Sequence, residues 1–190
     1  REREMVELAH SYGMRIFGPN SQGIQNADPE ISVYANFTFV PMKPGNISII
    51  AQGGGMGEML KLHLHNVGLG HRLHCSSGNE ADLRMPELLE YYGSDPGTRA
   101  IMMQIESFKD PAAFLRVASA ITPGKPILAI KAGRTREGSV AVSSHTGTLV
   151  DQAAMATAMF ERAGVVEFHD TDEMVKAAIA FSTQEPPAGN

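Results

Sequence analysis

The 190-residue sequence has a single cysteine, no tryptophan and no excess of basic residues. Cys75 cannot form an internal disulfide, so folding does not call for an oxidising compartment. Sixteen Lys and Arg residues against 21 Asp and Glu residues give a net charge of −5. This balance excludes the basic surface that nucleic-acid binding or attraction to an acidic membrane requires.

Long apolar runs are missing as well. No stretch has the length of a signal peptide or of a membrane-spanning helix. The hydrophobic content is nevertheless 43%, which can supply the core of one domain of ordinary size. We therefore expect a globular cytoplasmic protein that has neither nucleic acid nor membrane as a partner.

Both ends of the sequence look interrupted. The opening segment "REREMVELAHSYG" begins without methionine and already shows helical spacing of Met5, Leu8 and Tyr12. The closing segment "STQEPPAGN" has the proline and glycine content of a linker. We expect a fragment of a longer polypeptide.

Apolar strands alternate with amphipathic helices through most of the chain. Residues 14–17 are predicted as a short strand, and the chain is then predicted to be irregular to about Pro44. Further strands are predicted in "NISIIA", "GHRLHCSS", "RAIMMQIES", "KPILAIKAG" and "VVEF", with helices between them and after the last. Continuous apolar strands separated by helices indicate an α/β fold with a doubly wound parallel sheet of the flavodoxin type. Ligands of such sheets bind at the carboxyl ends of the strands.

The glycine turn "QGGGMGEM" lies at one of these ends. It can hold a phosphate through the backbone amides of Gly54, Gly55, Met56 and Gly57, because a helix begins there. It is not a P-loop, since no Gly-Lys-Ser/Thr follows. A tight turn that only allows close packing explains the glycines equally well, so both interpretations stay open.

Two further residues fall at the same predicted edge. Glu106 ends an otherwise apolar strand, and His145 follows the long aperiodic loop from Gly133 to Ser144, where a helix begins. Each alone is ordinary, but their shared location favours a function. No Gly-x-Ser-x-Gly motif supports a serine nucleophile.

The histidine-rich run does not have metal-ligand spacing. On a helix, His63 and His65 point in different directions, and His71, His74 and Cys75 fall on a strand beyond a turn. We expect no metal site.

Six ordered motifs resemble the nucleoside-diphosphate-forming acyl-CoA synthetases, the relatives of succinyl-CoA synthetase. They are "GPNSQG", "AQGGGMG", "SGNEADLRMPELLEYYGSDPGTRAI", "IESFKD", "KAGRTREG" and "SSHTGTL". The resemblance implies a phosphorylated histidine at His145 that Glu106 supports. It also implies phosphate binding by the glycine turn and by Ser144, Thr146 and Gly147, and CoA binding by Gly18, Pro19, Asn20 and Ser21.

Three positions depart from the family pattern. Ser21 replaces a cysteine, and Ala51 and Gly53 replace serines of the glycine turn. Side-chain hydroxyl contacts are therefore not expected from the turn, whereas contacts through the backbone amides are retained.

The same resemblance implies the organisation of the chain. Residues 1–44 correspond to the end of a CoA-binding domain and a linker, residues 45–183 to a flavodoxin-like CoA-ligase domain, and residues 184–190 to a further linker. The implied partners are an acyl substrate, phosphate and CoA within an oligomeric enzyme. ATP or ADP and Mg²⁺ are implied to bind an ATP-grasp domain or subunit outside this sequence.

Two functions remain open. The first is the phosphohistidine domain of an acyl-CoA synthetase that interconverts acyl-CoA, phosphate and NDP with acid, CoA and NTP. The second is a non-catalytic module that senses CoA or acyl-CoA and is fused to a protein acetyltransferase. The presence of both His145 and Glu106 favours the enzyme, because a sensing module needs neither.

Overall fold

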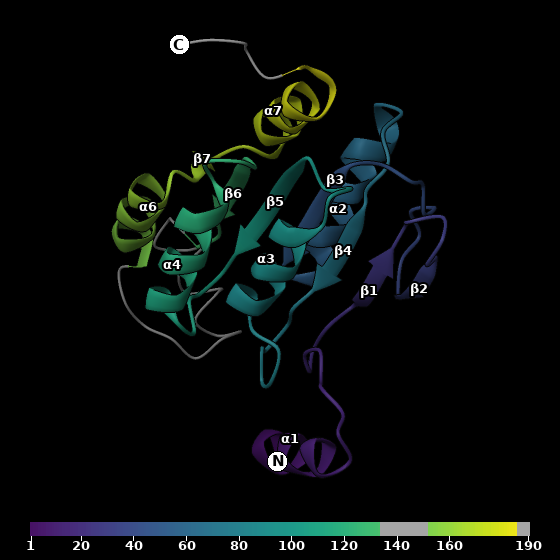
Figure 1. Ribbon diagram of the computed structural model, residues 1–190, viewed down its shortest axis with the longest axis vertical. Helices are drawn as coiled ribbons and strands as arrows, with labels where there is room; N and C mark the ends of the chain where they lie inside the picture. Colours follow the sequence, from purple (N-terminus) through teal and green to yellow (C-terminus); the bar gives the residue numbers. More distant parts are fainter. Residues whose placement is uncertain (134–151, 186–190) are drawn as a thin grey trace.

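The computed structural model describes residues 1–133 and 152–185. A seven-stranded sheet has helices packed on both faces (Figure 1). The strands are β1 (Gly23–Asn26), β2 (Val33–Asn36), β3 (Ile47–Ala51), β4 (Leu73–Ser76), β5 (Ala100–Ile105), β6 (Ile127–Lys131) and β7 (Val166–Phe168). The helices are α1 (Glu2–Ser11), α2 (Gly54–Asn66), α3 (Met85–Ser94), α4 (Pro111–Ile121), α6 (Gln152–Ala163) and α7 (Thr171–Thr183).

The order of the strands is β2-β1-β4-β3-β5-β6-β7. From β4 to β7 all neighbours are parallel, in the order typical of flavodoxin-like sheets, which confirms the predicted fold class. Every residue of β3, β5 and β6 is buried, because helices cover both faces of the sheet. Ala51 is in register with both Ser76 and Gln104, so β3, β4 and β5 end at one level.

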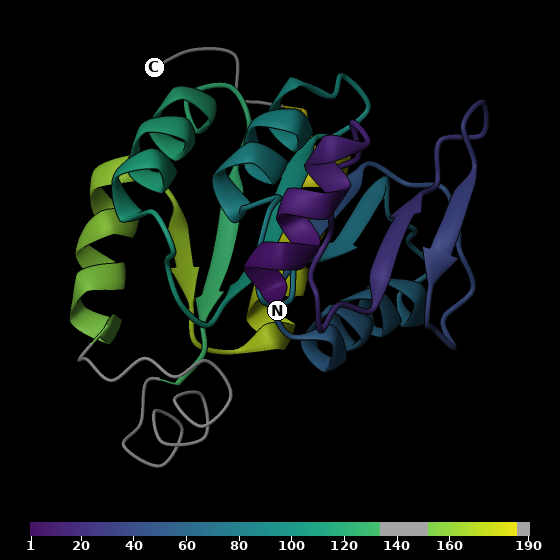
Figure 2. The same ribbon diagram turned by 90° about the horizontal axis from the view of Figure 1, so that it is seen from below.

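Two apolar cores lie on opposite faces of this sheet. Helices α3, α4 and α6 cover one face, where Phe114 and Phe160 are almost fully buried. Helices α2 and α7 cover the other, where Leu60 and Met174 are buried. Figure 2 shows the two helical layers with the sheet between them. None of the helices in the described ranges is long and apolar enough to cross a membrane.

The segment before Pro44 differs from the prediction. Residues 14–17 form no strand; the backbone amide of Ile16 donates to Asp82 Oδ2 at 2.7 Å, and the amide of Leu83 donates to the carbonyl of Ile16 at 3.2 Å. The stretch predicted to be irregular contains β1 and β2. Strand β1 pairs antiparallel with β4, and β2 pairs antiparallel with β1, so the sheet gains two edge strands.

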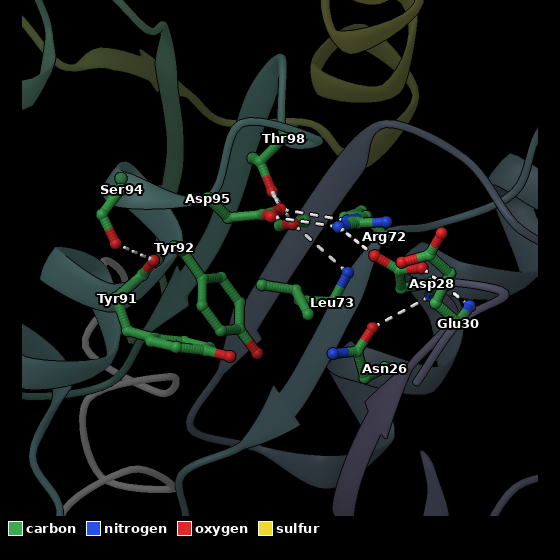
Figure 3. A network of polar contacts seen from close by, with 12 residues as sticks. Asn26, Asp28, Glu30, Arg72, Leu73, Tyr91, Tyr92, Ser94, Asp95 and Thr98 are labelled. Carbon is green, nitrogen blue, oxygen red and sulfur yellow. Dashed lines mark hydrogen bonds and ion pairs between the residues drawn. The ribbon is translucent and has the colours of Figure 1, made fainter. Parts of the chain in front are cut away.

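Arg72 ties this added part of the sheet to α3 (Figure 3). Its Nε and Nη2 atoms donate to the two carboxylate oxygens of Asp95 at 3.1 and 3.2 Å. Its Nη2 atom also lies 2.5 Å from Asp28 Oδ2, in the turn between β1 and β2. The fork of the guanidinium thus binds two carboxylates from separate parts of the chain.

Candidate functional site

A cleft opens at the carboxyl ends of β3 and β5, where the connections from these two neighbouring strands run in opposite directions. Ligands of open parallel sheets bind at such a switch point. The cleft has a volume of about 210 Å³, and its walls come from the loops after β3, β4 and β5, with additions from the first 20 residues. The lining residues are Glu2, Asn20, Gln52, Gly53, Gly54, Gly78, Asn79, Glu106, Ser107 and Lys109.

The amino end of α2 faces this cleft without a capping side chain. Helices α4 and α7 are preceded by the N-cap residues Asp110 and Asp170, whose carboxylates accept backbone amides of the first turn. Helix α2 follows Gly53 and has no side-chain cap. Within the described ranges, the amides of Gly54, Gly55 and Met56 have no protein acceptor. Free amides at a helix amino end are donors for an anion.

The fourth residue predicted to bind phosphate has a different role. The amide of Gly57 donates to the carbonyl of Gly53 at 3.1 Å and so closes the first turn of α2. A side chain at position 57 would meet His74 Nε2 at 2.8 Å, so glycine is needed there for packing. Only the three amides before it are free to contact a ligand.

Glu106 lies directly beyond β5, and its carboxylate lies against the glycine turn. A Cβ atom on Gly53 would be 2.8 Å from Glu106 Oε1, and Gln104 Nε2 is 3.5 Å from the same oxygen. The Gln104 side chain also accepts the amide of Gly53 at 2.8 Å. The structure therefore brings the predicted carboxylate and the predicted phosphate turn together.

The charged groups of the cleft are of both signs. Glu2 and Glu106 contribute carboxylates, and Lys109 contributes the single ammonium group among the described lining residues. Asn79 Nδ2 donates to Glu2 Oε1 at 2.6 Å. Lys109 is therefore the one lining cation in the described ranges that can offset the charge of an anion in this cleft.

The loop predicted to bind CoA reaches the cleft through one residue. Asn20 lines the cleft and donates to Asn79 Oδ1 at 3.3 Å, after a cis peptide bond between Gly18 and Pro19. The carbonyls of Gly18 and Pro19 accept amides from the loop after β4, and the Ser21 hydroxyl donates to the carbonyl of Ser76. Gly18, Pro19 and Ser21 therefore fix the loop rather than line the cleft.

The remaining predicted residues, Ser144, His145, Thr146 and Gly147, lie outside the described ranges. Strand β6, the last described strand before them, ends beside Glu106. Lys131 Nζ donates to the carbonyl of Glu106 at 2.7 Å, and the amide of Ala132 donates to the carbonyl of Ile105 at 2.8 Å. The segment that carries His145 thus follows a strand end in contact with the Glu106 backbone.

The histidine-rich run is divided between the surface and the interior. His63 Nδ1 lies 3.4 Å from Asp172 Oδ1, whereas His71 and His74 are buried. Burial, and then the charge of Lys61, lowers the pKa of His71 to about 4, and burial raises the pKa of the Cys75 thiol to about 12. In the part of the chain that the structure describes, no three His, Cys, Asp or Glu residues are placed to hold a metal ion.

Sequence reasoning missed the polar residues that hold the cleft together. Gln52 and Gln104 are buried at strand ends and hydrogen-bond to the loops that carry Glu106 and Gly53. Glu80, Asn79 and Lys109 were missed as well. A glutamine at the end of an apolar strand is the signal that could have identified the first two, because a buried amide requires partners.

Comparison with known proteins gives a family and its relatives. Residues 44–181 match the model of the succinyl-CoA ligase-like flavodoxin domain. The chain is 40% identical over 190 residues to the alpha subunit of an ADP-forming acetate–CoA ligase II from Pyrococcus furiosus, covering all of this chain and 40% of that protein. It is 36% identical to an ADP-forming acetate–CoA ligase from Methanocaldococcus jannaschii, covering all of this chain and 26% of that protein.

A solved structure is similar over nearly the whole chain. The acetyl-coenzyme A synthetase 1 of Ca. Korarchaeum cryptofilum, in complex with phosphate and ADP, superposes with a TM-score of 0.90 at 34% identity. The superposition covers 99% of this chain and 40% of that one. The chain therefore spans about two fifths or less of the length of these relatives.

Proposed function

The chain belongs to the succinyl-CoA ligase-like family, and on this premise we propose that it is the phosphoryl-carrying part of an ADP-forming acyl-CoA synthetase. The proposed reaction converts acyl-CoA, phosphate and ADP into a carboxylic acid, CoA and ATP, and it runs in either direction. Two relatives are named as acetate–CoA ligases, so acetyl-CoA is the acyl substrate to test first.

Three transfers make up the proposed reaction. A phosphate oxygen attacks the thioester carbonyl, which releases CoA as the leaving thiol and forms an acyl phosphate. A ring nitrogen of His145 then attacks phosphorus, so the P–O bond to the acyl group breaks and the carboxylic acid leaves. Phosphohistidine finally transfers its phosphoryl group to ADP, and the imidazole is restored.

This proposal rests on one observation: Glu106 and the uncapped amino end of α2 lie at the same cleft. A phosphate held by the amides of Gly54, Gly55 and Met56 lies close to the Glu106 carboxylate, and two such anions repel each other. An imidazole between them relieves the repulsion. One ring N–H donates a hydrogen bond to the carboxylate, while the other ring nitrogen bonds phosphorus. Glu106 then fixes the tautomer of His145 and offsets the positive charge of the ring.

The chain does not supply a nucleotide site of its own in this proposal. Two relatives carry the designation subunit alpha, and the chain covers only 40% of each. We therefore propose that an ATP-grasp domain or subunit binds ADP and Mg²⁺ and receives the phosphoryl group. We propose that residues 1–44 end a CoA-binding domain and residues 45–183 form the ligase domain, with β1 and β2 crossing this boundary to extend the ligase sheet. The loop at Gly18–Ser21 is proposed to contact CoA through Asn20, and residues 184–190 to form a linker.

Phosphoryl labelling of the complete enzyme tests the proposal. Acetyl-CoA and radiolabelled phosphate should place an acid-labile, base-stable label on the chain, as a phosphoramidate requires. His145→Asn keeps the approximate size of the side chain but has no nucleophilic ring nitrogen, so it should abolish the label and turnover. Glu106→Ala should lower turnover by about two to four orders of magnitude, as loss of other orienting carboxylates does.

The chemistry of the label separates the competing assignments. An acid-stable label would indicate a phosphate ester on a neighbouring Ser143, Ser144 or Thr146 and would overturn the assignment of His145. Absence of label and turnover from the complete wild-type enzyme, with CoA still bound, would instead support the sensing module.

A further inference from the structure

A buried glutamine joins the loops that form the cleft. Gln52 directly follows β3, and only 6% of it is exposed. Its Oε1 atom accepts the amides of Glu106 at 2.5 Å and Ser107 at 2.8 Å. Its Nε2 atom donates to the Ser107 carbonyl at 2.9 Å and to Glu80 Oε1 at 2.8 Å. All four hydrogen-bonding positions of the side-chain amide are therefore used.

Glu80 holds the outer end of this arrangement. The carboxylate is 3% exposed and accepts the Ser77 hydroxyl at 2.9 Å and the amide of Met85 at 3.2 Å, in addition to Gln52. Its backbone has a φ of 52°, in the left-handed region that few residues with a side chain adopt. No cation forms an ion pair with it within the described ranges. A buried carboxylate that depends on hydrogen bonds alone fixes its donors strongly.

The partners leave the Gln52 amide one orientation. Two backbone amides require the oxygen on the side of Glu106, and a carbonyl and a carboxylate require the nitrogen on the other side. Reversing the amide would place donor against donor and acceptor against acceptor at four contacts. The backbone of Glu106 and Ser107 is thereby locked to the end of β3.

This lock fixes the backbone that carries the Glu106 carboxylate. Gln52 is the chain neighbour of Gly53, which starts the turn into α2, and Glu106 Oε1 lies above that glycine. The same side chain therefore sets the spacing between the carboxylate and the amino end of α2. That spacing decides how close an anion held by the amides of α2 lies to the Glu106 carboxylate.

We propose that Gln52, held by Glu80, is the positioning residue that sets Glu106 against the amino end of α2 for phosphoryl transfer. The inference rests on the proposed function, because it assigns Gln52 a part in the same phosphoryl transfer. Gln52 acts through Glu106, so its loss should lower kcat while the KM for acyl-CoA stays near the wild-type value.

An exchange of amide and carboxylate tests the proposal in the complete enzyme. Gln52→Glu keeps the shape of the side chain but turns a carboxylate oxygen toward Glu80 and the Ser107 carbonyl. We expect the repulsion to move the Glu106 loop and to lower kcat by about 10- to 100-fold, the usual cost of losing such a supporting group. The double variant with Glu80→Gln restores a donor between positions 52 and 80 but leaves a carboxylate oxygen against the Ser107 carbonyl, so it should recover part of the lost kcat.

The control separates positioning from general stability. Gln25 is also buried and hydrogen-bonds to Lys61 Nζ at 3.2 Å, but it does not line the cleft. Gln25→Leu should therefore lower the melting temperature and leave kcat unchanged. If Gln52→Glu does not fold, Gln52→Met measures the loss of kcat. The double variant, Gln52→Glu with Glu80→Gln, then measures its recovery.

The outcomes keep the two proposals apart. Wild-type kcat in a folded Gln52→Glu or Gln52→Met variant, or no recovery in a folded double exchange, would overturn the role of Gln52 while the proposed function stands. An unlabelled and inactive wild-type enzyme would overturn the proposed function itself. A crystal structure of Gln52→Glu should show Glu106 displaced from Gly53, and an undisplaced Glu106 would also count against positioning.

Discussion

Gly53 lies beneath the Glu106 carboxylate, and a methyl group there would approach the Oε1 atom to 2.8 Å. Because the atom in the way is the end of a flexible side chain, Gly53→Ala should displace the carboxylate and leave the fold intact. We expect a loss of kcat of about tenfold or more, since catalytic groups must be placed within a fraction of an ångström. Steady-state kinetics of the complete enzyme and a melting curve measure the two effects.

Gly55 provides the matched control. No atom lies within 4 Å of a Cβ built on it, and it belongs to the same turn. Gly55→Ala should therefore stabilise α2 by up to about 1 kcal/mol, because alanine favours helix, and should lower kcat less than Gly53→Ala does, because the amide of residue 55 is kept. Equal losses of activity in both variants would mean that the turn needs backbone freedom rather than space for Glu106.

Single residues were predictable from sequence to different degrees. Glu106 was identifiable because a carboxylate that ends an apolar strand is conspicuous, and the structure places it at the predicted edge. Gln52 looked like part of a glycine turn. Its role depends on Glu106, Ser107 and Glu80, which are 28 to 55 positions away in the chain. Partners that distant leave no local pattern.

At the scale of elements, Arg72 anchors the antiparallel pair β1–β2 to the end of α3 (Figure 3). Arg72→Met would leave the carboxylates of Asp28 and Asp95, which are 18% and 13% exposed, without their cation. We expect the free energy of unfolding to fall by about 2 kcal/mol and the β1 amides to exchange faster with deuterium. Urea titration and hydrogen exchange measure these changes.

A second arginine at the surface supplies the comparison. Arg99 Nη2 donates to the carbonyl of Gln184 at 2.9 Å, and it forms no ion pair within the described ranges. Arg99→Met should change the unfolding free energy by less than about 0.5 kcal/mol. If both variants are equally stable, the contacts of Arg72 do not hold the strands.

The parallel strands were predictable and the antiparallel ones were not. In β3, β5 and β6 the apolar run itself is the signal, since both faces are buried. Strands β1 (GIQN) and β2 (VYAN) are short and only partly buried, and they exist because β4 offers an edge to pair with. Conversely, residues 14–17 are apolar enough for a strand but have no strand beside them.

For the whole molecule, two buried histidines predict a loss of stability in acid. The pKa of His71 is lowered to about 4 by burial and by Lys61, and that of His74 is also well below its usual value. Between pH 6.5 and 4 the unfolded chain therefore binds protons that the folded chain excludes. Stability should be level above pH 6.5 and fall below it, by about 1.4 kcal/mol per pH unit for each such histidine.

Urea unfolding at a series of pH values checks this slope. His71→Leu removes one titrating group and leaves no polar atom without a partner, so the decline between pH 6.5 and 4 should become shallower. Glu58, whose pKa is lowered despite burial by its bonds to Lys61 and Thr38, loses its contribution only below about pH 4.5. An unchanged slope in His71→Leu would show that other groups cause the acid sensitivity.

The added strands also bear on how such a domain can be exchanged in evolution or in the laboratory. The family match begins at residue 44, yet β1 and β2 lie before it and complete the sheet. A recombination breakpoint at that position would strip the hydrogen bonds from the outer edge of β4, and a bare edge invites pairing between molecules. It would also take Gln25 and Thr38 from the buried ammonium of Lys61. Breakpoints that transfer a soluble unit should therefore lie upstream of β1.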